Sequence, residues 1–181
     1  MRLPGSRTLR AAALGLLVAM SGAGAVAGAT QPAPCSAGGL RAAFRVVAGS
    51  AGAGSITYTV RLTNRRARAC VVSGRPGLRL LGAHGAALPT AVAPDRPGTG
   101  AAALIAVGHG RTAIALARFS PDIPGRGEPA KGRCEHVAHR VRVSLASPGS
   151  GSLTGAVSPP TPVCDHGRIA EGLLHLSAVG G

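Results

Sequence analysis

The stretch that decides the fold is Ile56-Thr57-Tyr58-Thr59-Val60-Arg61-Leu62-Thr63. Apolar residues occupy every second position, and threonines or an arginine fill the positions between them. Successive side chains of a β-strand point to opposite faces, so a period of two predicts a strand with one buried face and one wet face.

The same period occurs on both sides of this stretch. In 40–47 the apolar residues alternate with Arg41, Ala43 and Arg45, and in 137–145 they alternate with Arg140, Arg142 and Ser144. The only weak candidate for an amphipathic helix is 168–176. Further short strands are expected at 70–73, 77–81, 101–107, 112–119, 152–157 and 172–179.

Short strands separated by Gly-rich turns predict a fold class. We expect an all-β, antiparallel, immunoglobulin-like β-sandwich of seven to nine strands in a single domain. Three connections rich in Pro or Gly, 89–100, 120–133 and 147–162, are interpreted as mobile loops, and the alternative is that they are binding loops.

The N-terminal segment has the order of a secretory signal peptide. Three arginines precede the uncharged run 11–20, and small residues follow up to Ala29. The apolar run is too short to span a bilayer, which takes about 20 residues. We therefore expect a signal peptide at 1–29, cleavage after Ala29, a short linker at 30–34 and the β-sandwich domain at 35–181. The mature chain would be secreted, extracellular or in the cell envelope, without a transmembrane anchor.

The composition is strongly basic. The chain has 20 Lys and Arg residues against six Asp and Glu. Loss of 1–29 would remove three arginines and no acid, which leaves a net charge of +11. One interpretation is GC-rich coding, and the other is attraction to polyanions outside the cell. Nucleic acid is a poor candidate because stacking platforms need aromatic side chains, which are only 2% of the chain.

The four cysteines, Cys35, Cys70, Cys134 and Cys164, all follow the signal peptide. An even number in an exported protein predicts two disulfides. If 40–47 runs out and 55–63 runs back, Cys35 and Cys70 lie at the same end. The same count for 137–145 and 152–157 pairs Cys134 with Cys164.

Motifs for catalysis are missing from the sequence. It contains no Gly-x-Ser-x-Gly elbow and no Gly-x-Gly-x-x-Gly loop. His136 and His139, next to Cys134, resemble metal ligands, but positions three apart on a strand face opposite ways and oxidised cysteines lose their thiolates. We expect no catalytic residues, no metal and no cofactor.

Arginines are densest from the end of the deciding stretch onward, where Arg61, Arg65, Arg66, Arg68 and Arg75 form a cluster. One interpretation of this cluster is a solvated hairpin tip, and the other is capture of an anion such as a cell-wall phosphate, because guanidinium groups bind phosphate through two parallel hydrogen bonds. The candidate anion-binding residues are Arg65, Arg66, Arg68 and Arg75.

A family resemblance rests on one pattern. Tyr58, Asn64 and Cys70 are spaced by five residues each, and Gly74-x-Pro76-Gly77 follows. With the early Cys35, the segment Val107-Gly108-His109-Gly110 and the late Cys164, the chain resembles the secreted actinobacterial family named domain of unknown function 4232. The resemblance implies export and a β-sandwich, and it brings no catalytic or ligand residues.

Two classes of function follow from these observations. The first is a non-catalytic envelope or extracellular module that binds an anionic surface polymer or a protein partner. The alternative is a secreted enzyme, such as a hydrolase, whose site the sequence does not reveal.

Overall fold

The computed structural model describes residues 31–98, 102–129, 134, 136–147 and 149–178. The chain divides into two compact units, 1–30 and 31–181, and everything below concerns the second. The expected signal peptide and its cleavage site lie outside the described residues.

The described residues form β-strands and two short 3-10 helices, and they include no α-helix. The elements are η1 (Ala37–Gly39), β1 (Leu40–Val46), β2 (Ile56–Asn64), β3 (Cys70–Val72), β4 (Gly77–Leu81), β5 (Ala91–Pro94), β6 (Ile105–Val107), β7 (Thr112–Phe119), β8 (Val137–Ser144), β9 (Ser152–Pro162), η2 (Asp165–Gly167), β10 (Arg168–Glu171) and β11 (His175–Leu176). The all-β prediction is confirmed.

The main sheet is mixed. Its strand order is β4-β8-β9-β1-β2-β7-β10-β5, with β11 on β7, and a second sheet pairs β3 with β6. The pairs β1–β9 and β10–β5 are parallel, so the expected wholly antiparallel arrangement is wrong at these two places. Parallel neighbours need a long crossover, which a pattern of short alternating strands does not reveal.

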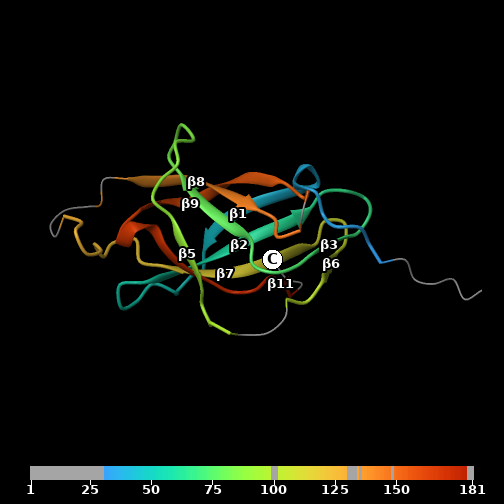
Figure 1. Ribbon diagram of the computed structural model, residues 1–181, viewed down its shortest axis with the longest axis horizontal. Helices are drawn as coiled ribbons and strands as arrows, with labels where there is room; N and C mark the ends of the chain where they lie inside the picture. The colour runs from blue at the N-terminus through green and yellow to red at the C-terminus, as the bar shows by residue number, and fades with distance from the viewer. Residues whose placement is uncertain (1–30, 99–101, 130–133, 135, 148, 179–181) are drawn as a thin grey trace, which may run out of the picture. The chain divides into compact units, whose positions relative to one another are not determined.

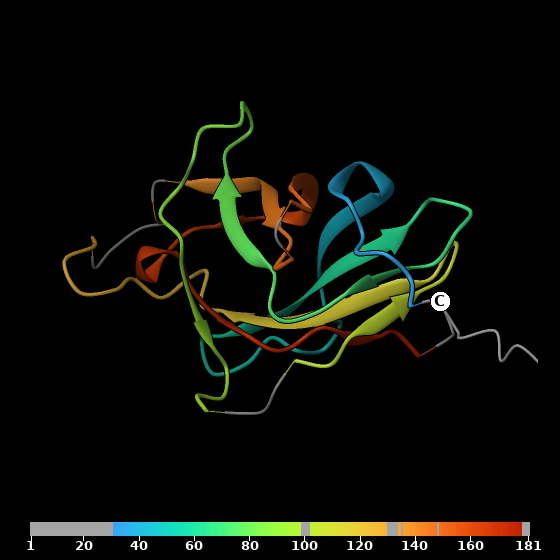
Figure 2. The same cartoon turned by 45° about the vertical axis from the view of Figure 1, so that its right-hand side comes forward.

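The two edge strands of the main sheet, β4 and β5, are linked by the segment of chain that connects them. The connection between β4 and β5 runs back along β4, where the Leu88 N–H donates to the Leu80 carbonyl at 2.9 Å and the Leu80 N–H donates to Thr90 Oγ1 at 3.0 Å. The sheet is therefore nearly a barrel. Figure 2 shows β2 and β7 on one side, β8 and β9 on the other, and β1 joining them.

The core contains all three aromatic side chains of the protein. Tyr58 stacks on Phe44 with ring centroids 4.5 Å apart and meets Phe119 edge-on at 6.4 Å. Opposite these large residues, β7 presents alanines; the register pairs Tyr58 with Ala117. Large residues of β2 thus pack beside small residues of β7, which fills the interior despite the low aromatic content.

Both predicted disulfides are present. Cys35 bonds Cys70, and Cys134 bonds Cys164, which closes loops with sequence separations of 35 and 30 residues. The pairs β1–β2 and β8–β9 are antiparallel, as the pairing argument required.

Several boundaries differ from those expected. β9 reaches Pro162, well beyond the predicted 152–157 and through most of the presumed mobile loop 147–162. Pro159 and Pro160 lie where the register with β8 is irregular, so their missing N–H groups remove no ladder bonds. The presumed loop 89–100 likewise contains β5.

The structure of the segments 168–176 and 172–179 also differs from the expected one. The first is not a helix but contains β10, and the second keeps only the two-residue β11. The side chains of Ile169 and Glu171 in β10 both point inward. Because a glutamate occupies one of the buried positions, the sequence lacks the apolar alternation by which a strand is recognised. The expected strand at 101–107 begins only at Ile105.

Candidate functional site

Three of the four predicted anion-binding arginines share one loop. Arg65, Arg66 and Arg68 are exposed in the connection from β2 to β3. Buried Asn64 holds this loop: its Oδ1 accepts from the Arg66 N–H at 2.9 Å, and its Nδ2 donates to the carbonyls of Arg68 and Val107, each at 2.9 Å. The hydrogen bonds of Asn64 therefore fix the backbone of the loop that carries these arginines.

The fourth arginine lies elsewhere. Arg75 is half-buried in the turn between β3 and β4, and its Nε–H donates to the Glu171 carbonyl at 3.2 Å. The structure thus places Arg75 against β10 rather than in the exposed loop with Arg65, Arg66 and Arg68.

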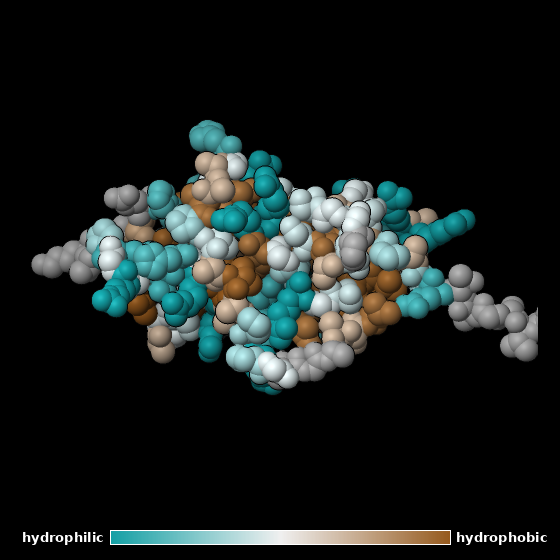
Figure 3. Space-filling model, viewed as in Figure 1, coloured by the Kyte–Doolittle hydropathy of each residue, from teal (hydrophilic) through white to brown (hydrophobic). Residues whose placement is uncertain are grey.

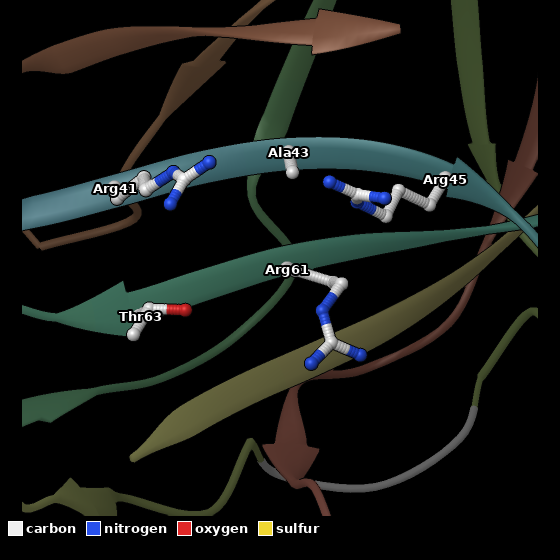
Figure 4. A pocket seen from close by; sticks show the side chains of 5 residues that line it. All are labelled: Arg41, Ala43, Arg45, Arg61 and Thr63. Carbon is white, nitrogen blue, oxygen red and sulfur yellow. The ribbon is translucent and has the colours of Figure 1, made fainter. Parts of the chain in front are cut away.

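A second basic surface lies on the outer face of β1 and β2. Arg41, Ala43 and Arg45 of β1 line a hollow of about 390 Å³ with Arg61 and Thr63 of β2. In Figure 4 the side chains of Arg41 and Arg45 extend toward each other over Ala43, while Arg61 extends from β2 on the β7 side. Two positive side chains therefore converge over one small residue.

The register extends this surface across the sheet. Ala43 pairs with Arg61 on one side and with Ala156 of β9 on the other, and Ala156 pairs with Arg140 of β8. Residues that pair directly share a face of the sheet. One row thus carries an alanine floor with an arginine at each end.

Two further arginines face each other at the next strand pair. Arg79 of β4 pairs directly with Arg142 of β8, and both are exposed. We call the outward side chains of β4, β8, β9, β1 and β2 the arginine face; its arginines are Arg41, Arg45, Arg61, Arg79, Arg140 and Arg142.

The five strands of the arginine face contain neither Asp nor Glu. Among the described residues, none of its six arginines forms an ion pair. Like charges directly opposite on a sheet are destabilising, so the direct pairing of Arg79 with Arg142 lowers stability.

The sequence contained part of this signal. The alternation in 40–47 already placed Arg41, Ala43 and Arg45 on one wet face. Grouping Arg61 with the following loop hid its place beside Ala43, because only the strand register brings the two together.

Glu171 is the one fully buried acid of the described residues. Neither carboxyl oxygen has a hydrogen-bond partner, and burial raises the pKa of Glu171 to about 8 against the opposing effect of Arg75. This carboxyl group is closed to a ligand, so we assign it to the interior and not to a site.

Glu128 fastens another loop. Its Oε2 accepts from the N–H groups of Gly125 and Asp165, each at 2.7 Å, and its Oε1 accepts from the His166 N–H at 2.8 Å. These hydrogen bonds, first among them that of Gly125, lower the pKa of Glu128. Part of the presumed mobile loop 120–133 is therefore bound to η2.

Other surface features offer less chemistry. A hollow of about 240 Å³ is lined by Thr57, Asp95, Arg96, Leu116, Arg118 and Ala170. In Figure 3 apolar residues form separate patches among polar ones on the visible face. In the part of the chain that the structure describes, no group of three or more His, Cys, Asp or Glu residues could hold a metal ion. No helix there is long and apolar enough to cross a membrane.

The comparisons with known proteins give a family. The model of the family described as Domain of unknown function (DUF4232) matches residues 35–174. The chain belongs to this family. No curated protein and no solved structure matches it.

The residues on which the DUF4232 resemblance rests stabilise the fold. Tyr58 is in the core, Asn64 fixes the arginine loop, and Cys70 is in a disulfide. Gly74 has a φ of +78° and its carbonyl accepts from the Leu174 N–H at 3.0 Å, while Pro76 is buried. This pattern therefore marks the fold of the DUF4232 domain, and the arginine face lies outside it.

Proposed function

We propose that this DUF4232 domain is an exported, non-catalytic module that binds an anionic polymer of the cell envelope through its arginine face. The observation that carries the proposal is a set of six arginines on four of five neighbouring strands, none of which contains an acid. A repeating polyanion can contact several of these arginines at once, so weak individual attractions add up.

The loop arginines extend the same surface. The Arg65 N–H donates to the Gly39 carbonyl at 2.9 Å, and Arg41 lies two residues further along the chain from Gly39. Arg65, Arg66 and Arg68 therefore lie beside the Arg41 end of the arginine face. A polymer on that face could continue onto the loop.

Export is supported by the signal-like order of 1–29 and by the two disulfides, which persist in oxidising compartments. Sequencing of the protein from culture supernatant should find a mature N-terminus between Ala27 and Gln31. Recovery of the full-length chain from the cytosol alone would contradict export. Actinobacterial origin and likeness to an immunoglobulin sandwich stay predictions.

The hydrolase alternative receives no support from the described residues, where no serine or threonine hydroxyl is hydrogen-bonded to an imidazole. A protein partner remains the second binding hypothesis. A panel of substrates tests the enzyme, and capture of a protein without polymer tests the partner.

A binding assay on purified cell walls of the producing organism tests the proposal. The mature protein should sediment with the walls at 0.1 M salt and be released at 1 M, because the Debye length falls from about 10 Å to about 3 Å. Arg41→Ser/Arg45→Ser/Arg61→Ser should reduce binding most. Arg65→Ser/Arg66→Ser/Arg68→Ser should reduce it less, and Arg75→Ser should act through stability instead. Salt-insensitive binding, or a face variant that binds like the wild type, would reject the proposal.

A further inference from the structure

The convergence of Arg41 and Arg45 is the most specific feature of the arginine face. The two residues are four positions apart on one strand, so their Cα atoms are roughly 13 Å apart. Their side chains nevertheless extend toward each other over Ala43 instead of away from each other. Two guanidinium groups that share one small space repel each other.

The surface between Arg41 and Arg45 consists of small residues, which leave the space above them open. Ala43 is half-buried, and its neighbour Ala156 on β9 is equally small. Gly155, one residue earlier, lets β9 approach β1, since a Cβ there would collide with the Ala42 carbonyl. The hollow of about 390 Å³ above this floor leaves room for a small anionic group between the two guanidinium groups.

The arrangement of the acceptor oxygens distinguishes the anions that could fit. A carboxylate has two oxygens, and a single guanidinium fork can occupy both. A phosphoryl group arranges its oxygens in a tetrahedron and not in one plane, so even the two unesterified oxygens of a phosphodiester can accept from guanidinium groups that approach from opposite sides.

We infer that Arg41 and Arg45 form a two-arginine clamp for one phosphoryl group, with Ala43 as its floor. This inference rests on the proposed function and names the ligand chemistry of that surface. The phosphoryl group can belong to the phosphodiester backbone of a surface polymer or to a terminal or free phosphate.

Arginine-to-lysine variants separate the clamp from simple charge. Arg41→Lys/Arg45→Lys keeps both positive charges but removes the planar forks. The matched control is Arg111→Lys/Arg118→Lys, which makes the same change at two exposed arginines outside the arginine face, one before β7 and one within it. Equilibrium binding at fixed ionic strength is measured with poly(glycerol phosphate) and with poly(glutamate) of equal charge number, and thermal unfolding verifies that each variant is folded.

The wild type should bind the phosphate polymer at least about tenfold more tightly than the carboxylate polymer, the factor expected for one or two charge-assisted hydrogen bonds. Arg41→Lys/Arg45→Lys should lose this preference, and the control should keep it. Competition by inorganic phosphate would place the ligand among terminal or free phosphates. Competition by the polymer alone would place it in a phosphodiester backbone.

Failure of the clamp differs from failure of the proposed function. Equal binding of both polymers, or equal loss of preference in both lysine variants, would overturn the clamp and leave general polyanion binding intact. Absence of binding to either polymer would overturn both.

Discussion

At the scale of single residues, Glu171 ties the stability of the domain to pH. Its pKa rises from an ordinary 4.5 to about 8 because burial disfavours the charged form. The folded protein therefore holds a proton that the unfolded chain releases above about pH 4.5. The contribution of Glu171 to stability is fully present below that pH and is lost as pH rises toward about 8, by about 1.4 kcal/mol per unit.

Glu171→Gln should remove this pH dependence, because a neutral amide never ionises. Urea unfolding at pH 5 and pH 9 should show the variant gaining stability relative to the wild type at the higher pH. Asp95→Asn is the matched control, because Asp95 is an exposed acid whose N–H donates to the Glu171 carbonyl. Parallel pH profiles of wild type and Glu171→Gln would contradict the assignment of a buried neutral acid.

Asn64 makes a second prediction at this scale. Its side chain is buried and makes three hydrogen bonds, two of them donated to carbonyls. Asn64→Ala should lower the free energy of unfolding by roughly 2 to 4 kcal/mol, since it leaves buried partners unpaired. Asn64→Asp should be at least as harmful, because a carboxylate oxygen would face those carbonyls. An aspartate variant as stable as the wild type in urea unfolding would exclude this role.

At the scale of elements, the close contact of β1 with β9 assembles the arginine face. Gly155→Ala should cost about 1 to 3 kcal/mol of stability, since the added methyl group collides with the backbone of β1. Gly77→Ala is the control, because a Cβ there would meet the Ser144 Cβ at an ordinary 3.4 Å. Thermal unfolding compares the two, and equal midpoints would show that the strands are not in close contact.

The elements also show what a sequence can predict. Alternation located β1, β2 and β8, and together with the count of strand directions it predicted both disulfides, because these depend on neighbouring antiparallel pairs. The parallel contact of β1 with β9 was missed, because it joins strands more than a hundred residues apart. Prolines concealed the second half of β9, and buried Glu171 concealed β10.

At the scale of the whole molecule, the candidate site depends on the parallel pairing of β1 with β9, which the sequence did not predict. The sequence predicted anion capture at Arg65, Arg66, Arg68 and Arg75, and the structure gathers only the first three in one exposed loop. The arginine face arises when β8, β9, β1 and β2 lie side by side, which places arginines from distant segments on one surface. Charge composition alone could not distinguish that arrangement from an even distribution.

The acids of the described residues lie outside the five strands of the arginine face. Asp122, Glu128 and Asp165 are in connections or in η2, Asp95 follows β5, and Glu171 is in the interior. The arginine face is therefore a surface of one sign of charge, which suits attraction to an extended polyanion more than a compact neutral ligand.

The most direct test of polyanion binding on the arginine face is titration of isotope-labelled mature protein with poly(glycerol phosphate), followed by amide chemical shifts. Binding on the arginine face should give the largest shifts at Ala43, Arg61 and Ala156 and smaller ones in 65–68, and these shifts should disappear in Arg41→Ser/Arg45→Ser/Arg61→Ser. Shifts confined to another surface, or none at saturating polymer, would contradict it.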